Sequence, residues 1–171
     1  KSTVRIDQAI QRFFNALPFV KPAVETVPTQ EALARILGED VISQVDIPSF
    51  DRSAVDGYAV HAEDTFGASS TNPSILTLIG EIDAGFKPDL EVERGEAAKI
   101  ATGAAMPNDA DAVVMLEYTK MIDPHRIEVW TPVTPCENVT RKGEDVHTGE
   151  VVLKKGVRIR PQDVGILVML G

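Results

Sequence analysis

The sequence has one cysteine, few aromatic residues and no cluster of basic residues, and each shortage narrows the possible functions. Cys136 cannot form a disulfide within the chain, which fits a reducing compartment and a packed thiol. Aromatic residues make up 5% of the chain, so we expect an aliphatic core. The 17 basic and 26 acidic residues give a net charge of -9, with no run of Lys or Arg that could follow a phosphate backbone. We therefore expect no nucleic-acid partner.

Long apolar runs are also absent. The longest run, at 164–170, is far shorter than the roughly 20 residues that span a bilayer, and no charged-then-apolar leader opens the chain. We expect a cytoplasmic protein that does not enter a membrane. Because the chain starts at Lys1 without a methionine and stops at Gly171 after an apolar segment, we expect it to be a fragment of a longer protein.

Two helices are predicted near the amino end. A helix over 6–17, closed by Pro18, is predicted by apolar residues at helical spacing, namely Ile6, Ala9, Ile10, Phe13 and Leu17. We expect this apolar stripe to dock on another element. After a short extended piece at 23–27, Thr29 is a suitable N-cap and Gly38 a suitable end for a second helix.

From Glu39 onward the pattern changes to short apolar runs broken by Gly, Pro, Asp and Asn, which predict strands. One pair of runs predicts a hairpin whose turn is centred on Asp123 and Pro124. The end of the chain predicts a buried helix that begins at Pro161 and ends at Gly171.

This order of elements favours an α+β fold over an alternating parallel sheet. We expect a strand-rich lobe of short strands, residues 49–140, inserted between the terminal segments. Those segments, 1–48 and 141–171, are expected to form a second, partly helical elongated lobe.

Polar side chains gather in the stretch 49–60, which fits neither a helix nor a strand with one apolar face. A loop holding Asp56 and Gly57, followed by a strand from Tyr58 to Val60, explains it better. Asp-Gly is a strong turn pair because glycine tolerates positive φ and aspartate bonds to nearby backbone N–H groups. Composition alone leaves open that the stretch is an ordinary surface turn.

Two further stretches carry candidate chemistry. Thr102, Gly103 and Ala104 have small side chains after a short strand, so their N–H groups and one hydroxyl could face an anion. The stretch 138–150 sets two basic residues beside two acidic ones and also reads as a solvated charged turn. The three histidines lack the spacing of metal ligands, and the single cysteine completes no zinc pattern. Carboxylates and hydroxyls instead suit an oxygen-preferring cation such as Mg²⁺.

These three stretches, in this order and separation, resemble the N-terminal half of the molybdopterin molybdenumtransferases, the bacterial and archaeal family whose animal relative is gephyrin. The resemblance covers nearly the whole chain. Its most specific motif runs Pro-x-Phe-Asp-x-Ser-x-x-Asp-Gly-Tyr-Ala in the family and matches Pro48, Phe50, Asp51, Ser53, Asp56, Gly57, Tyr58 and Ala59.

The resemblance implies an activity and its partners. Family members take adenylylated molybdopterin and molybdate, release AMP and work as dimers, so it implies a homodimer, a dependence on Mg²⁺ and contact with the molybdopterin adenylyltransferase. The pterin-binding and C-terminal domains of the family lie after the region seen here. It also implies that residues 1–48 with 141–171 form the dimerisation lobe, that residues 49–140 complete an active cleft, and that the fragment alone is inactive.

The resemblance also implies the roles of single residues. Asp56, Thr102 and Asp145 match the family's functional residues, with Asp56 as the expected Mg²⁺ ligand. The expected substrate-binding residues are Asp51, Ser53, Gly57, Tyr58, Gly103, Glu117, Arg141 and Lys142. Two positions depart from the family pattern. Thr140 stands where many relatives have arginine, which puts an anion contact there in doubt, and Arg52 replaces a common asparagine and could pair with Asp51 or Asp56.

Two alternative functions stay open. The chain could be a dimerisation and partner-binding scaffold module without catalysis of its own. It could also be a small metal-dependent hydrolase that uses Asp51, Asp56 and Asp64.

Overall fold

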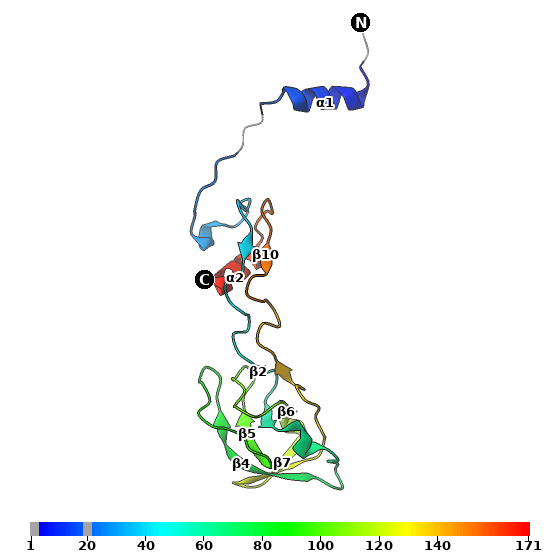
Figure 1. Cartoon of the computed structure of the whole chain (residues 1–171), viewed down its shortest axis with the longest axis vertical. Coiled ribbons are helices and arrows are strands. Elements are labelled where there is room, and N and C mark those ends of the chain that lie inside the picture. Colours follow the sequence, from blue (N-terminus) through cyan, green and yellow to red (C-terminus); the bar gives the residue numbers. More distant parts are fainter. Residues whose placement is uncertain (1–3, 19–21) are drawn as a thin grey trace. The chain divides into compact units, whose positions relative to one another are not determined.

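The computed structural model describes residues 4–18 and 22–171 (Figure 1). The chain divides into two compact units, which we describe separately. One comprises the described residues up to Glu39 together with Lys155–Met169, and the other comprises Asp40–Lys154 with the last two residues. The predicted borders near 48 and 140 fall inside the second unit. None of the described helices is long and apolar enough to cross a membrane.

The first unit contains helix α1 (Ile6–Ala16), a single 3-10 turn η1 (Thr29–Glu31) and all but the last residue of helix α2 (Pro161–Leu170). The predicted helix over 6–17 is confirmed, but none of its residues is buried, and Phe13 and Phe14 are 63% and 65% exposed. The expected docking of its apolar stripe is therefore not found in the described chain.

The predicted second helix, from Thr29 to Gly38, is wrong beyond its first turn. Ala34 has φ +65°, which no right-handed helix accommodates. The backbone there bonds to a distant segment instead: Ala34 N donates to Ile159 O at 2.9 Å, and Leu37 N donates to Val157 O at 2.9 Å. These long-range bonds replace the local bonds that a helix would form.

Helix α2 begins at Pro161, as predicted, and is followed by Gly171 with φ +99°. Its first turn is closed by Asp163, whose Oδ2 accepts bonds from Arg160 N at 2.8 Å and Arg160 Nε at 3.0 Å. The predicted burial of this helix is wrong for the described chain, because Asp163 is its one buried residue and Met169 is 62% exposed.

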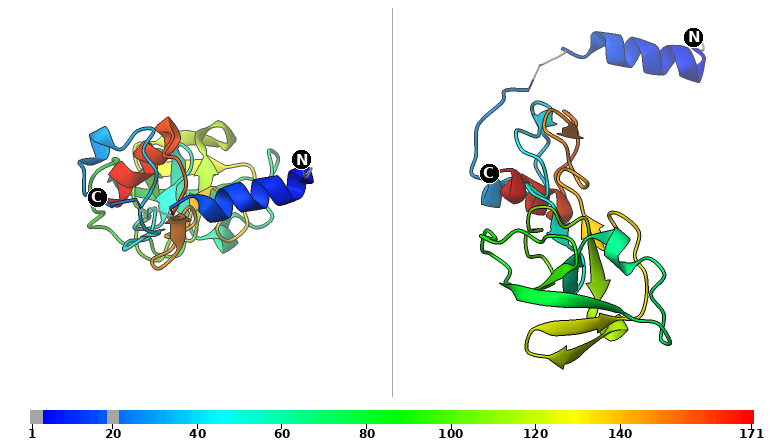
Figure 2. Two further views of the ribbon diagram at one scale, coloured as in Figure 1. Left: turned by 90° about the horizontal axis from the view of Figure 1, so that it is seen from above. Right: turned by 60° about the horizontal axis from the view of Figure 1, so that its bottom comes forward.

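The second unit is built on a curled six-stranded sheet with the order β6-β3-β5-β4-β8-β7 (Figures 1 and 2). Its strands are β3 (Gly57–Val60), β4 (Ser74–Ile82), β5 (Glu96–Ile100), β6 (Ala112–Met115), β7 (Thr119–Asp123) and β8 (Arg126–Val129). Neighbouring strands are antiparallel except β4 and β5, which run parallel. The predicted hairpin is confirmed as β7–β8, and its turn is closed by His125 N donating to Asp123 Oδ1 at 2.9 Å.

Both faces of the central strands are buried, which explains why these strands read as continuous apolar runs. One core cluster contains Tyr58, Val60, Ala97 and Val114, and the other contains Ala59, Ala98, Ile100 and Val113 (with further members). Successive residues of β3, β5 and β6 thus point alternately into the two clusters.

The remaining elements are short. Two 3-10 turns, η2 (Ala62–Thr65) and η3 (Leu116–Tyr118), flank the sheet. Two small ribbons pair β1 (Val41–Ile42) with β10 (Val151–Leu153), and β2 (Arg52–Ser53) with β9 (Val139–Thr140). The strand-rich part of the expected α+β fold is confirmed, whereas a second, partly helical lobe is not established by these residues.

Candidate functional site

Asp56 and Thr102 form a clamp at the ends of two paired strands. Asp56 directly precedes β3 and Thr102 follows β5, and the antiparallel pairing of Gly57 with Ile100 brings them together. Thr102 N and Thr102 Oγ1 each donate a hydrogen bond to Asp56 Oδ1 at 2.7 Å. The backbone oxygen of Asp56 accepts a bond from Leu116 N at 3.2 Å. Asp56 is therefore tied to the segments that follow β5 and β6, the two neighbours of β3.

The clamp leaves the carboxylate of Asp56 charged and accessible. The hydroxyl and backbone bonds from Thr102, with a smaller contribution from Lys99, hold the pKa of Asp56 below its ordinary value. Asp56 is exposed, and its Oδ2 has no hydrogen-bond partner among the described residues. One carboxylate oxygen is thus held in place while the other remains available to a ligand.

Gly57 is required by close packing rather than by an unusual backbone angle. A Cβ at this position would lie 2.1 Å from Val114 O and 2.8 Å from Val113 Cγ1. The next residue, Tyr58, is 4% exposed and packs in the core cluster with Val60 and Val114. These two positions fix the backbone of β3, and Asp56 lies at the start of this strand.

The turn around Gly103 is locked to β2. Gly103 N donates to Ser53 O at 2.8 Å, and Ser53 N donates to Ala104 O at 2.9 Å. Ala104 N donates to Ala101 O at 3.0 Å. All three N–H groups from Thr102 to Ala104 are thus used within the chain, so the anion-binding turn expected from the sequence is not formed. The buried Ser53 hydroxyl donates to Val55 O at 2.6 Å.

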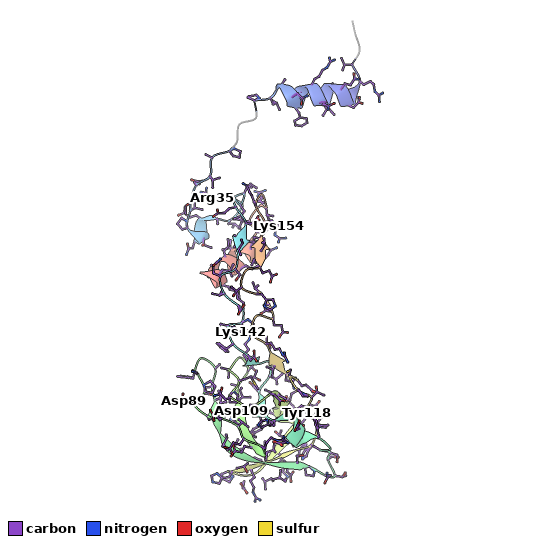
Figure 3. All side chains as sticks on the ribbon, viewed as in Figure 1. Arg35, Asp89, Asp109, Tyr118, Lys142 and Lys154 are labelled. Carbon is purple, nitrogen blue, oxygen red and sulfur yellow. The ribbon has the colours of Figure 1, made fainter. Side chains whose placement is uncertain are left out.

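A second group of predicted residues lies around the β2–β9 ribbon. Lys142 N donates to Asp51 Oδ1 at 2.7 Å, and Lys142 lies beside this ribbon (Figure 3). Arg52 lies 3.9 Å from Asp145 Oδ2 and is thus not paired with Asp51 or Asp56, the two partners considered from the sequence. The pairing of Arg52 with Thr140 across the ribbon sets this geometry.

Arg141 is held in place by two contacts near the β2–β9 ribbon. Its backbone N donates to Glu144 Oε2 at 2.8 Å, and its guanidinium donates to Cys136 Sγ. This bond raises the pKa of Arg141 above its ordinary value. Glu117 lies in η3, where it is exposed, one residue after the Leu116 N–H that bonds to Asp56.

Sequence reasoning missed Lys99. It lies in β5 between core residues, and its Nζ is 2.6 Å from Glu81 Oε1 on β4. The bond to Glu81, with smaller contributions from Tyr58 and Asp83, raises the pKa of Lys99. A signal was available, because a lysine interrupting an otherwise apolar strand must reach solvent or a charged partner.

Sequence reasoning also missed a second clamp of the same kind. Thr148 N and Thr148 Oγ1 donate to Asp46 Oδ1 at 2.8 Å and 3.0 Å. The other oxygen of Asp46 is not free, since Lys142 Nζ lies 3.4 Å from Asp46 Oδ2. The two clamps therefore differ in whether their second carboxylate oxygen is available.

The three aspartates of the hydrolase alternative do not form one site. Asp64 accepts bonds from Arg94 Nε and Gly95 N, both at 2.7 Å, whereas Asp56 and Asp51 are held by Thr102 and Lys142. Within the described residues no group of three or more His, Cys, Asp or Glu side chains is placed to hold a metal ion. A cation at Asp56 would need ligands from a substrate, water or another part of the protein.

Comparisons with known proteins show that this chain is similar to the N-terminal part of molybdopterin biosynthesis proteins. It belongs to the MoeA family: the model of the MoeA N-terminal region (domain I and II) matches residues 4–171. The chain is similar to a molybdopterin biosynthesis protein of Methanocaldococcus jannaschii, with 49% identity over 86% of this chain and 35% of the relative. It is also 40% identical to a molybdopterin molybdenumtransferase of Staphylococcus aureus over 100% of this chain and 40% of the relative.

Solved structures agree with this assignment. A crystal structure of a molybdopterin biosynthesis moeA protein from Pyrococcus horikoshii OT3 matches with a TM-score of 0.83 and 50% identity, over 86% of this chain and 38% of that one. A second structure of the Pyrococcus protein also gives a TM-score of 0.83, with 38% identity over 99% of this chain and 43% of that one. The chain thus spans well under half the length of the proteins it matches.

Proposed function

We propose that this chain is the N-terminal part of a molybdenum insertase, which transfers molybdate to adenylylated molybdopterin and releases AMP. The observation that carries the proposal is the Asp56–Thr102 clamp, in a chain that belongs to the MoeA family. The clamp presents one ionised carboxylate oxygen at an exposed strand end, where a substrate bound mainly by other domains can reach it.

The negative charges of Asp56 and of the substrates are the reason to propose a cation at this site. Molybdate and the phosphates of the adenylylated pterin are anionic, so the bare carboxylate of Asp56 would repel them. Mg²⁺ is commonly held by one or two carboxylates together with water and substrate phosphates, and the free Oδ2 of Asp56 fits that requirement. The cation would reverse the sign of the contact and polarise the P–O bond that is cleaved.

The residues of this chain would bind and position the cation and the substrate. Asp56 would hold the cation, and Thr102 fixes the orientation of Asp56 and keeps it ionised. We propose that Asp51, Arg141, Lys142 and Asp145 border the same substrate from the β2–β9 side. Ser53, Gly57, Tyr58 and Gly103 support it indirectly, because their polar groups or packing are used within the chain.

A second function is favoured by helix α1. Its exposed apolar residues, Ile6, Ile10, Phe13 and Phe14, are 52% to 80% exposed, so another surface is expected to cover them. We propose that the chain takes part in a homodimer and that the protein contacts the molybdopterin adenylyltransferase which supplies its substrate. If these contacts were the sole task of the chain, it would be a scaffold module.

One experiment separates the enzyme from the scaffold. AMP release is measured with adenylylated molybdopterin, molybdate and Mg²⁺, for this chain alone and for the full-length protein. We expect release by the full-length protein and none by the chain alone. If the full-length protein also releases no AMP yet dimerises, the insertase proposal is wrong and the scaffold is favoured. Release by the chain alone would contradict the expected need for the other domains.

A further inference from the structure

Lys99 and Asp56 lie on the same face of the sheet. In the antiparallel pairing of β3 with β5, Tyr58 is opposite Lys99 and Gly57 is opposite Ile100. Asp56, two residues before Tyr58, therefore shares the face of Tyr58 and Lys99 and is a diagonal neighbour of Lys99. Diagonal neighbours in a sheet are about 7 to 8 Å apart, which a lysine side chain spans.

Glu81 holds Lys99 in this position. Glu81 is opposite Lys99 in the parallel pairing of β4 with β5, and Lys99 Nζ lies 2.6 Å from Glu81 Oε1. The two side chains are 40% and 57% exposed, respectively, so the pair stands at the rim of the core and faces solvent. Glu81 thus fixes the ammonium on the β4 side of β5, where it stays partly exposed and its charge still contributes to lowering the pKa of Asp56.

The backbone N–H groups near Asp56 are not available to bind an anion. The N–H groups from Thr102 to Ala104 are all donated within the chain, whereas the side chain of Lys99 stays 40% exposed beside its bond to Glu81. Lys99 is the cationic residue whose charge contributes to lowering the pKa of Asp56, and it is opposite Tyr58, two residues after Asp56.

We propose that Lys99 is a substrate-binding residue of the Asp56 site, whose ammonium binds a phosphate oxygen of the incoming substrate. The inference rests on the proposed function and adds a residue to it. Glu81 acts as a positioning residue, since it contacts Lys99 rather than the ligand. A charge-assisted bond from a partly exposed ammonium contributes to binding in the ground state as well as in the transition state, so its loss raises KM more than it lowers kcat.

The test uses the full-length protein with adenylylated molybdopterin at saturating molybdate and Mg²⁺. We expect Lys99→Met to raise KM for the pterin substrate about tenfold with kcat changed less than about twofold, and Lys99→Arg to restore most of the affinity. The KM of the Met variant should also depend less steeply on ionic strength. Lys120→Met, which removes an exposed charge from β7, is the matched control and should leave KM unchanged.

The outcomes separate this inference from the proposed function. A wild-type protein that releases AMP, with Lys99→Met and Lys120→Met giving the same KM, overturns the role of Lys99 and leaves the insertase intact. A fall in kcat and melting temperature together, without rescue by Lys99→Arg, shows a structural role and also overturns it. If the wild type releases no AMP, the insertase proposal fails and the role of Lys99 fails with it.

Discussion

Thr102 binds one oxygen of Asp56 twice, through its backbone N–H and its hydroxyl, both at 2.7 Å. The pair joins residues 46 positions apart in the sequence and depends on the register between β3 and β5. A side chain fixed at one oxygen and open at the other is prepared to bind a cation without first being ordered. This relationship leads to the first two predictions.

Asp56→Asn should abolish the dependence of AMP release on Mg²⁺ in the full-length protein and lower kcat by at least about a hundredfold, since cation stabilisation of the transition state amounts to several kcal/mol. The measurement is AMP release across a Mg²⁺ titration. Asp46→Asn is the matched control, because Asp46 forms the same kind of clamp with Thr148 but has its second oxygen beside Lys142. Turnover and Mg²⁺ dependence unchanged by Asp56→Asn would remove the cation hypothesis.

Thr102→Val should raise the pKa of Asp56 towards its ordinary value of 3.8, because the hydroxyl bond that contributes most to lowering it is lost. The backbone bond persists, so the return should be partial. A carboxyl ¹³C titration of this chain by NMR measures the pKa directly, and Thr102→Ser should keep it low. An equal pKa in the wild type and the Val variant would contradict the bond from Thr102 Oγ1.

Gly57→Ala should destabilise the strand-rich unit by about 3 kcal/mol or more, since the new Cβ would lie 2.1 Å from the backbone oxygen of Val114. Backbone in a central strand pair cannot shift without breaking the pairing of β3 with β6. Urea unfolding monitored separately in each of the two units provides the measurement. Gly165→Ala in α2 is the control, because its Cβ would meet nothing within 4 Å, and it should be neutral or stabilise the helix by up to about 1 kcal/mol. Similar stabilities for the two variants would refute the close contact.

Asp163 should make the stability of α2 dependent on pH. The side-chain and backbone bonds from Arg160 hold the pKa of Asp163 below its ordinary value of 3.8. Because the folded-state pKa of Asp163 is lowered, its ionised form stabilises the helix at pH values above the ordinary pKa. This stabilisation is lost as the pH falls through the folded-state pKa. Amide hydrogen exchange of α2 should therefore show less protection in Asp163→Ala than in the wild type at pH 7. The difference should shrink well below pH 3.8, and one that stays constant with pH would contradict the ionised pair.

Some of the site could be predicted from sequence because its signals are local. The strand after Asp56, the hairpin at Asp123 and the start of α2 at Pro161 each depend on backbone preferences of a few consecutive residues, whereas Gly57 is required by packing against Val114 rather than by the positive φ expected of a turn. The predicted helix after Thr29 failed for the opposite reason. Its apolar spacing was suitable, but the backbone near Ala34 bonds to the segment around Ile159, which no local pattern reveals.

The sequence by itself determined the family, the strand-rich middle and the residue types of the site, because motifs and short apolar runs are patterns of neighbouring residues. Only the tertiary structure decided which of those residues meet. Strand register joins Asp56 to Thr102, directs Arg52 to Asp145 instead of Asp56, and puts Lys99 on the face of the clamp. Register depends on long-range hydrogen bonds and on two-sided burial of β3, β5 and β6, which act between segments tens of residues apart.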